Sequence, residues 1–349
     1  MRVLVAMSGG VDSSVAAALM KEEGHEVVGV TLKLWQGPAG ELPTAGCCTL
    51  ADSEDARRVA AQLDIPYYVL DYTTSFQSGV VDRFVADYRH GRTPNPCVEC
   101  NRTVKFARLL AEARAFGCDL LVTGHYARVD HGPPPRLWRG RDRRKDQSYV
   151  LSMLGPSQLA RVRLPVGELT KEETRGIAAE LGLRTAHKRE SQDICFVGVG
   201  NYREFLRRHD PEVLAPGSIL DGEEYVGAHD GVAGFTIGQR HGLGVALGKR
   251  RYVVEIRADD RTVVLGERGH LRVDSLVLED LTWTRTPMEV GAEVEIQYRA
   301  HGEPVPGRLT ATGVCFSEPQ YGIAPGQTAA LYADLVVLGS GVIARADRG

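Results

Sequence analysis

The sequence predicts an α/β N-terminal domain, with a parallel sheet and helices on both faces, followed by a small β-containing central domain and a C-terminal β-barrel. Two observations predict this order. In the first half, short apolar runs alternate with amphipathic stretches, which is typical of βαβ units. From about residue 215, Gly, Pro and Asp become frequent and short runs alternate between apolar and polar residues, which indicates antiparallel strands. We expect the domains to span residues 1–200, 201–272 and 273–349.

The elements of the N-terminal domain follow from these runs in chain order. Strands are predicted at 2–7, 26–34, 67–72 and 119–126, and helices at 13–24, 51–64 and 104–117. A further helix is expected within 168–183, because Thr170 and Glu173 form a capping box and Gly182 lies near its end. In the second half, strands are predicted within 251–257, 262–267, 292–300 and 328–344.

Composition excludes several classes of protein. With 43% hydrophobic and 25% charged residues, the chain is neither disordered nor fibrous. The apolar run Val3–Met7 is too short for a signal peptide or a membrane span, so we expect a cytoplasmic protein. Seven cysteines do not indicate a disulfide framework. The net charge of −3 excludes a basic surface overall, but residues 136–145 hold six Arg and Lys, which fits either a solvated loop or a nucleic-acid contact.

A phosphate-binding loop is predicted at "MSGGVDSS", residues 7–14, between the first strand and the first helix. Gly9 and Gly10 let a phosphate approach the main chain, and the helix end that follows is electropositive. No lysine follows the glycines, so this is not a Walker A loop. Asp12 is a candidate ligand for Mg²⁺ that bridges phosphate oxygens. The alternative is a structural glycine turn.

This loop resembles that of the PP-loop ATP pyrophosphatases, which have an adenine nucleotide alpha hydrolase-like fold. The chain also carries "GRTPNPCVECNRTVKF", "TGHYAR", "KDQSYVL", "LPVGELTK", "SQDICFVG" and "FTIGQRHGLG" in colinear order, and with these it resembles the tRNA-specific 2-thiouridylases from residue 1 to about 343. The resemblance implies that ATP with Mg²⁺ adenylates the C2 oxygen of the wobble uridine in tRNA and that sulfur then replaces this oxygen. It places the ATP contacts at Ala6, Met7, Ser8, Gly9, Gly10, Val11, Asp12, Ser13, Leu32 and Gly124.

Cysteine chemistry is the second implication of the resemblance. Cys195 is then the persulfide carrier and Cys100 the resolving cysteine, which attacks the inner sulfur and closes a disulfide. Cys97 stands where many family members have Asp. An alternative is therefore a [4Fe–4S] cluster held by Cys97, Cys100 and Cys195. A zinc site lacks a second Cys or His pair at suitable spacing. Cys47 and Cys48 are interpreted as a structural pair in a loop.

RNA contacts are the third implication. The target base would lie against Asn95, Pro96 and Cys97, and the tRNA against Lys145, Asp146 and Gln147. Gln297 and Tyr298 in the C-terminal domain stand where the family often has Arg-Tyr near the anticodon, although Tyr298 also fits an ordinary strand tyrosine. The expected partners are the anticodon stem-loop of tRNA and a sulfur relay protein or cysteine desulfurase. His125 is interpreted as structural.

Two other functions share parts of this pattern. A PP-loop synthetase that uses ammonia would have the phosphate loop but no use for Cys100 and Cys195. A non-catalytic RNA-binding module would have a decayed nucleotide site, whereas the loop from Ser8 to Ser14 is intact.

Overall fold

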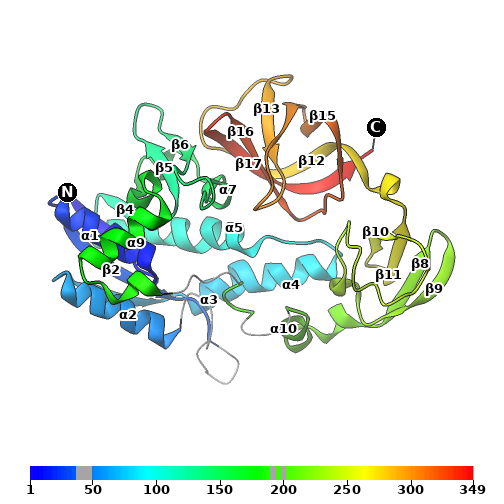
Figure 1. Cartoon of the computed structure of the whole chain (residues 1–349), viewed down its shortest axis with the longest axis horizontal. Coiled ribbons are helices and arrows are strands. Elements are labelled where there is room, and N and C mark those ends of the chain that lie inside the picture. Colours follow the sequence, from blue (N-terminus) through cyan, green and yellow to red (C-terminus); the bar gives the residue numbers. More distant parts are fainter. Residues whose placement is uncertain (37–48, 189–193, 198–201, 349) are drawn as a thin grey trace.

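The computed structural model describes residues 1–36, 49–188, 194–197 and 202–348. It contains three domains: an N-terminal α/β domain, a central β domain and a C-terminal barrel that lies above the helices connecting the other two (Figure 1). The predicted fold class is confirmed.

The N-terminal domain is built on a five-stranded parallel sheet with the order β3-β2-β1-β4-β7. The strands are β1 (Arg2–Ala6), β2 (Glu26–Lys33), β3 (Tyr67–Asp71), β4 (Leu120–Thr123) and β7 (Val162–Arg163). Both faces are buried, as a parallel sheet requires. Val3, Val5 and Met7 pack into one apolar cluster, whereas Leu4 and Ala6 pack against another.

Different helices cover the two faces. The first cluster includes residues of α1 (Val11–Glu22), α2 (Leu50–Gln62) and α9 (Lys171–Glu180). The second includes residues of α3 (Thr73–Phe76), η1 (Gln77–Val81), α4 (Asp82–Arg89), α5 (Pro96–Cys100), η2 (Asn101–Phe106) and α6 (Ala107–Ala115). The predicted capping box is present: the Thr170 side chain accepts from Glu173 N at 3.2 Å, and the Glu173 side chain accepts from Thr170 N at 2.7 Å.

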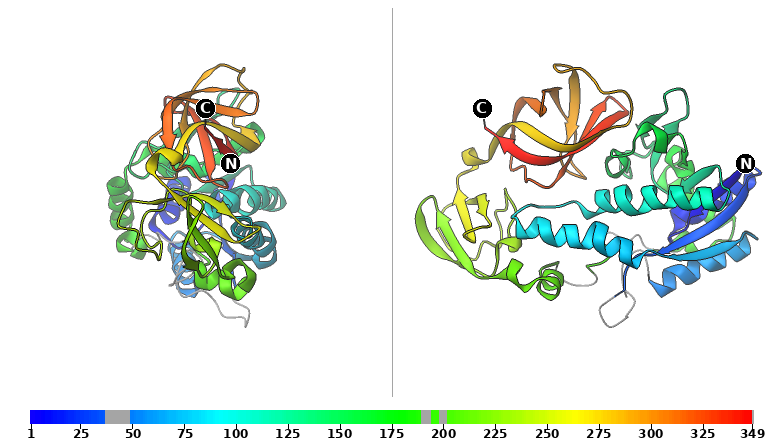
Figure 2. Two further views of the ribbon diagram at one scale, coloured as in Figure 1. Left: turned by 90° about the vertical axis from the view of Figure 1, so that its right-hand side faces the viewer. Right: turned by 180° about the vertical axis from the view of Figure 1, so that it is seen from behind.

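Two long helical segments, α3 to α4 and α5 to α6, run side by side from the N-terminal domain to the central domain (Figure 2). The sequence analysis predicted only the second half of the later segment and missed the earlier one. Both contain a π-helical stretch, η1 and η2, and these two stretches are in contact. A Cβ on Gly79 of η1 would lie 3.1 Å from Thr103 Oγ1 of η2. The smallest residue therefore allows the two helices to approach closely.

The central domain is a four-stranded sheet with the order β10-β11-β8-β9. Its elements are α10 (Tyr202–His209), η5 (Pro211–Leu214), β8 (Gly217–Asp221), β9 (Glu224–His229), η6 (Val232–Gly234), β10 (Tyr252–Arg257), β11 (Thr262–Gly266) and η7 (Arg268–Leu271). Its apolar cluster includes Ile219, Phe235, Val253 and Val263.

Pairing between the first and last strands, β12 and β17, closes the C-terminal barrel. The barrel strands are β12 (Arg272–Trp283), β13 (Glu293–Gln297), β14 (Val305–Leu309), β15 (Gly313–Tyr321), β16 (Thr328–Ala333) and β17 (Val336–Asp347). Two strands of the N-terminal domain, β5 (Ala127–Asp130) and β6 (Arg136–Arg139), extend its sheet because β6 pairs with β17. The start of the basic run, for which the sequence left open a solvated loop or a nucleic-acid contact, is thus a strand that joins two domains.

Short elements complete the N-terminal domain: α7 (Ser148–Leu151), α8 (Pro156–Leu159), η3 (Pro165–Glu168) and η4 (Arg184–His187). No helix in the described part of the chain is both long enough and apolar enough to cross a membrane.

Candidate functional site

The predicted phosphate loop lies between the carboxyl end of β1 and the first turn of α1. Gly9 has φ +73°, and a Cβ there would lie 2.1 Å from the carbonyl oxygen of Asp52 in α2, so only glycine fits. A Cβ on Gly124, just after β4, would lie 2.6 Å from Ser13 N. Gly10, in contrast, would place a Cβ no closer than 3.5 Å to Ser8 Oγ. The loop is thus enclosed at Gly9 and Gly124 and has room at Gly10.

Hydroxyl groups fold the loop onto itself. Ser8 N donates to Ser13 Oγ at 3.1 Å, and Ser13 Oγ and Ser14 Oγ both donate to Gly10 O, at 3.1 and 2.9 Å. Ser8 is exposed, whereas Ser13 is 5% exposed. Of the predicted ATP contacts in this loop, Ser8 is exposed, and Gly10 and Asp12 are partly exposed.

The remaining predicted ATP contacts mainly support the loop. Met7, Val11 and Leu32 are buried in the apolar clusters on the two faces of the sheet, and Ala6 is half-buried at the end of β1. Main-chain groups fix the strand end, because Met7 N donates to Val30 O at 2.7 Å. The side chains of Met7, Val11 and Leu32 therefore support the loop from within the two apolar clusters.

Asp12 is held by two side chains that the sequence analysis did not include in the site. Lys171 Nζ, at the start of α9, donates to Asp12 Oδ1 at 2.7 Å and to Oδ2 at 2.9 Å. Tyr126 Oη donates to Asp12 Oδ1 at 2.8 Å. Both carboxylate oxygens therefore face a lysine. An ionised carboxylate has about four lone-pair sites, so Asp12 could also ligate Mg²⁺ beside ATP phosphates, as predicted, while it stays paired with Lys171.

Lys188 is a second lysine at the loop that the sequence analysis missed. Its Nζ donates to Gly9 O at 3.0 Å and to the carboxylates of Asp52 and Asp55, each at 2.7 Å. Burial lowers the pKa of Lys188, but the hydrogen bonds and charges of Asp52 and Asp55 outweigh it, so the net pKa is raised. Lys171 and Lys188 thus place two ammonium groups against the loop, each already paired with carboxylates, Lys171 with Asp12 and Lys188 with Asp52 and Asp55. Neither lies in the loop sequence, so only the fold reveals them.

His125 follows Gly124 at the same edge of the sheet. Its Nδ1 lies 2.7 Å from Thr123 Oγ1, and its ring packs 5.8 Å from that of Phe106. Burial, and to a lesser extent Lys105, lowers the pKa of His125 to about 3. A neutral, packed imidazole agrees with the structural role predicted for it.

The CxxC pair lies on helix α5. Asn95 caps this helix by accepting from Val98 N at 3.3 Å, and Pro96 occupies its first turn, where a missing N–H costs nothing. Cys97 is exposed, whereas Cys100 is 5% exposed and packs in the apolar cluster under the sheet. The two thiols of the motif thus occupy different environments.

Cys195 lies in the short described segment 194–197, and an aromatic anchor positions it. The ring of the next residue, Phe196, packs 5.5 Å from Phe76, 5.3 Å from Phe84 and 5.0 Å from Phe205. Cys195 itself packs against the apolar cluster that contains Cys100 and that also contacts Ala6 at the end of β1. Both thiols thus lie at the apolar cluster that covers one face of the sheet, and Ala6 at the end of β1 packs against the same cluster.

The three cysteines do not fit the iron–sulfur alternative in this conformation. Cys97, Cys100 and Cys195 all belong to the described part of the chain, and no group of three or more His, Cys, Asp or Glu there is placed to hold a metal ion. We therefore derive no step through a cluster. Cys47 and Cys48 lie outside the described residues.

The barrel holds the turn before α5, where the target base is predicted. Thr93 N donates to Pro325 O at 2.8 Å, and Gln327 Nε2 donates to Thr93 O at 2.8 Å. Arg83 of α4 bridges Glu99 of α5 and Asp280 of β12, at 3.4 and 3.1 Å. The turn therefore rests on a separate domain.

The predicted tRNA contacts Lys145, Asp146 and Gln147 lie in the N-terminal domain, where Gln147 is bonded to Tyr126 of the phosphate site. Gln147 Oε1 accepts at 2.9 Å from the main-chain N–H of Tyr126, the same residue whose hydroxyl binds Asp12. Asp146 accepts from Gly140 N at 2.9 Å and from Ser148 N at 3.0 Å. Asp146 and Gln147 therefore have structural roles in this conformation, and Lys145 is half-buried beside them.

Gln297 and Tyr298 lie at the end of β13. Gln297 is 6% exposed, and its Nε2 donates to Arg299 O and Ala300 O, each at 3.1 Å. Tyr298 Oη donates to Gln320 Oε1 at 2.9 Å, and its ring packs on Phe316. Both side chains thus support the barrel, which matches the ordinary strand tyrosine that the sequence left open for Tyr298. A direct RNA contact at either position stays a prediction.

The fold and the loop define an ATP-using enzyme of the PP-loop class. A family model described as "tRNA methyl transferase HUP domain" matches residues 1–199, and models described as "tRNA methyl transferase PRC-barrel domain" and "Aminomethyltransferase beta-barrel domain" match residues 203–267 and 273–343. Proteins named tRNA-specific 2-thiouridylase MnmA are similar over nearly the whole chain. The one from Roseiflexus castenholzii is 46% identical and that from Roseiflexus sp. 47%, each covering 99% of both chains. The one from Acidothermus cellulolyticus is 47% identical and covers 100% of this chain and 99% of its own.

The chain therefore belongs to the tRNA-specific 2-thiouridylase family. A solved 4-thiouridine synthetase–RNA complex with bound ATP aligns with 60% of this chain and 50% of its own, at 18% identity and a TM-score of 0.36, which is too low for a comparison of sites.

Proposed function

We propose that this enzyme performs ATP-dependent 2-thiolation of the wobble uridine in tRNA, with Cys195 as the persulfide carrier and Cys100 as the resolving thiol. The observation that carries the proposal is that both cysteines pack on one apolar cluster, which also contacts the strand end leading into the phosphate loop. Family membership supports the same reaction.

The first step makes the C2 oxygen of uracil a leaving group. Oxide does not depart from a carbonyl-like carbon at neutral pH, but AMP does. The C2 oxygen attacks the α-phosphorus of ATP, so an O–P bond forms and the bond from the α-phosphorus to the bridging oxygen breaks, releasing pyrophosphate. Ser8 and Gly10 are accessible groups for phosphate, the electropositive start of α1 follows them, and Lys171 and Lys188 lie against the same loop. When bound, Mg²⁺ would add further neutralisation, with Asp12 as its ligand.

The second step delivers sulfur. The terminal sulfur of a Cys195 persulfide attacks C2. The Cys100 thiolate then attacks the inner sulfur, and the S–S bond electrons move to the sulfur on C2. AMP leaves as the C2–O bond breaks, and a Cys100–Cys195 disulfide remains for a thiol reductant. The persulfide sulfur comes from a donor protein, either a relay protein or a cysteine desulfurase. Since Cys100 is buried, the helix that carries it shifts when tRNA enters.

Sulfur incorporation into tRNA tests the proposal, with ATP, a persulfide donor and a thiol reductant. We expect Cys100→Ser and Cys195→Ser each to abolish 2-thiouridine but to retain tRNA-dependent pyrophosphate release, because adenylation needs neither thiol. The matched control is Cys315→Ser, since Cys315 lies in the barrel strand β15. Full thiolation by either active-site variant would overturn the cysteine roles, and loss of thiolation on iron chelation would favour the iron–sulfur alternative. Without tRNA-dependent pyrophosphate release in any variant, the protein would be a binding module.

The proposal includes a cytoplasmic location, because the substrate is tRNA. It also includes the anticodon stem-loop as the part of tRNA that reaches Asn95, Pro96 and Cys97.

A further inference from the structure

A hollow of about 560 Å³ lies in the central domain, away from the cysteines and the phosphate loop. Residues 240–251, between η6 and β10, line it. Five side chains of the lining are basic: Arg240, His241, Lys249, Arg250 and Arg251. Among the described residues that line it, none is acidic and none is Phe, Tyr or Trp. The hollow can therefore attract an anion but cannot stack a base on an aromatic ring.

The loop around the hollow is anchored to the domain. Gly238 N donates to Val253 O at 2.8 Å, and Val253 N donates to Gln239 O at 2.9 Å. The Leu243 side chain is 8% exposed and packs into the apolar cluster of the domain. The ion pair from Arg251 Nε to Asp221 Oδ1, at 2.6 Å, fixes the other end. The basic side chains are thus presented by a loop that is held at both ends.

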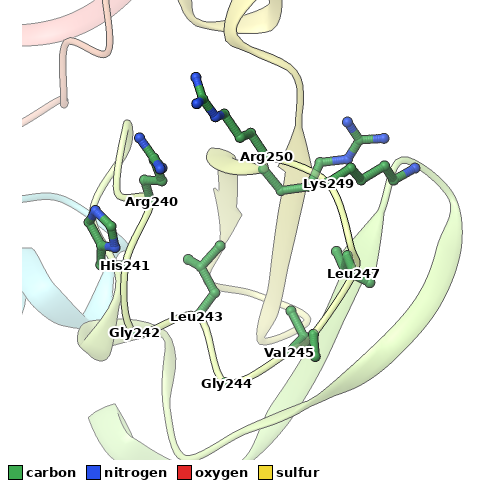
Figure 3. A pocket seen from close by; sticks show the side chains of 11 residues that line it. Arg240, His241, Gly242, Leu243, Gly244, Val245, Leu247, Lys249 and Arg250 are labelled. Atoms are coloured by element: carbon green, nitrogen blue, oxygen red, sulfur yellow. The ribbon is translucent and has the colours of Figure 1, made fainter.

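Two of the arginines are available for a ligand. Lys249 and Arg251 both pair with Asp221. Arg240 and Arg250 are exposed, and neither makes a side-chain hydrogen bond or ion pair with any part of the chain that the structure describes. Figure 3 shows both guanidinium groups extending along the same side of the hollow. Two exposed guanidinium groups on one hollow, without a carboxylate partner in the described part of the chain, form a surface suited to phosphate.

The position of the hollow fits the substrate of this enzyme. Strand β10 leads from Arg251 to Ile256, and a Cβ on Gly91, at the end of α4, would lie 2.9 Å from Ile256 Cγ2. Residues 92–95 then lead directly to the predicted target-base turn. Five strand residues span about 17 Å. A tRNA whose anticodon lies at this turn extends farther than this span of about 17 Å. Its phosphates can therefore reach the hollow.

We propose that residues 240–250 form a binding surface for the phosphate backbone of tRNA, with Arg240 and Arg250 as its contacts, so that the central domain contributes affinity that is independent of base sequence. This inference rests on the proposed function, since it takes tRNA as the substrate. Phosphate contacts position a nucleic acid without reading its sequence, and each one adds to the salt dependence of binding.

The test is the salt dependence of tRNA binding to the full chain, measured for wild type and for Arg240→Ala/Arg250→Ala between 50 and 300 mM salt. Losing two phosphate contacts should reduce the slope of log K against log[salt] by about 1.4 to 1.8, and should weaken binding about 25- to 60-fold at 0.1 M salt. The substitution Arg240→Lys/Arg250→Lys should retain most of the slope, because the contact needs charge more than shape. Turnover at saturating tRNA and ATP binding should be unchanged.

The matched control is Arg57→Ala/Arg58→Ala on α2, which removes the same charge from exposed arginines that pair with Glu54. An equal effect of the control would show a net-charge effect and overturn the proposal. An unchanged slope and affinity of the Arg240→Ala/Arg250→Ala variant would also overturn the proposal. A loss of thiolation that appears only when a protein supplies the sulfur would overturn it as well, since the surface would then bind that donor. If the substitutions at Arg240 and Arg250 reduce the salt dependence of tRNA binding as expected but wild type does not thiolate tRNA, the proposed function is wrong and the proposed binding surface is supported.

Discussion

Acidification provides a sharp test of the environment assigned to His125. Its pKa of about 3 lies below the ordinary histidine value of 6.5 because burial disfavours the charged imidazolium. Between these two pH values the unfolded chain binds the proton and the folded chain does not, so stability rises with pH. This contribution is fully present above pH 6.5 and is lost as pH falls towards 3. It changes by up to about 1.4 kcal/mol per pH unit within this range.

The perturbation is His125→Asn, whose side-chain oxygen can still accept from Thr123 Oγ1 but which cannot titrate. At pH 7 the variant should be less stable than wild type by about 1–2 kcal/mol, because the ring contact with Phe106 is lost. At pH 4.5 wild type has lost about 3 kcal/mol from the histidine alone, so the variant should be the more stable of the two.

The assay is urea denaturation followed by the fluorescence of Trp35, in a background with Trp138→Phe and Trp283→Phe so that only the N-terminal domain is observed. His301→Asn, at an exposed position, should show no such crossover. A difference between wild type and His125→Asn that stays constant from pH 7 to 4.5 would refute the buried, neutral imidazole. So would a His125 ring resonance that titrates above about pH 5 in NMR.

Three further predictions concern the loop and the thiols. Gly9→Ala should destabilise the protein by at least about 1–2 kcal/mol in chemical denaturation, because φ at Gly9 is +73° and the new Cβ would lie 2.1 Å from a carbonyl oxygen of α2. Gly10→Ala should destabilise it far less. Equal losses of stability in the two variants would contradict the close approach at Gly9. Lys171→Met should lower the free energy of unfolding by about 1–3 kcal/mol, because it leaves the Asp12 carboxylate without its ammonium partner. Adding Asp12→Asn to this variant should restore part of the lost stability. If the effects of the two substitutions are purely additive, the two residues do not interact. Under native conditions iodoacetamide should alkylate the exposed Cys97 faster than the buried Cys100, which peptide mass spectrometry can follow. Faster alkylation of Cys100 would contradict the orientation of α5.

Local sequence patterns predicted the fold class and the phosphate loop of this protein, whereas the thiolation chemistry was implied by the family resemblance. Apolar runs of strand length between amphipathic stretches predicted the parallel sheet, and Thr170 with Glu173 predicted the start of α9, because both signals act between residues that are close in the chain. Gly9 and Gly10 after the first strand predicted the phosphate loop for the same reason.

Only the tertiary structure decided what meets the loop and what is accessible. Lys171 and Lys188 reach it from more than 150 residues away, and neither has a local signature because a lysine in a first helical turn or a loop is ordinarily solvated. The same holds for strand β6, which pairs with β17 across the chain, and for Gln297, whose burial follows from closure of the barrel. Contacts of this kind depend on strand register and domain packing, which no local pattern of residues specifies.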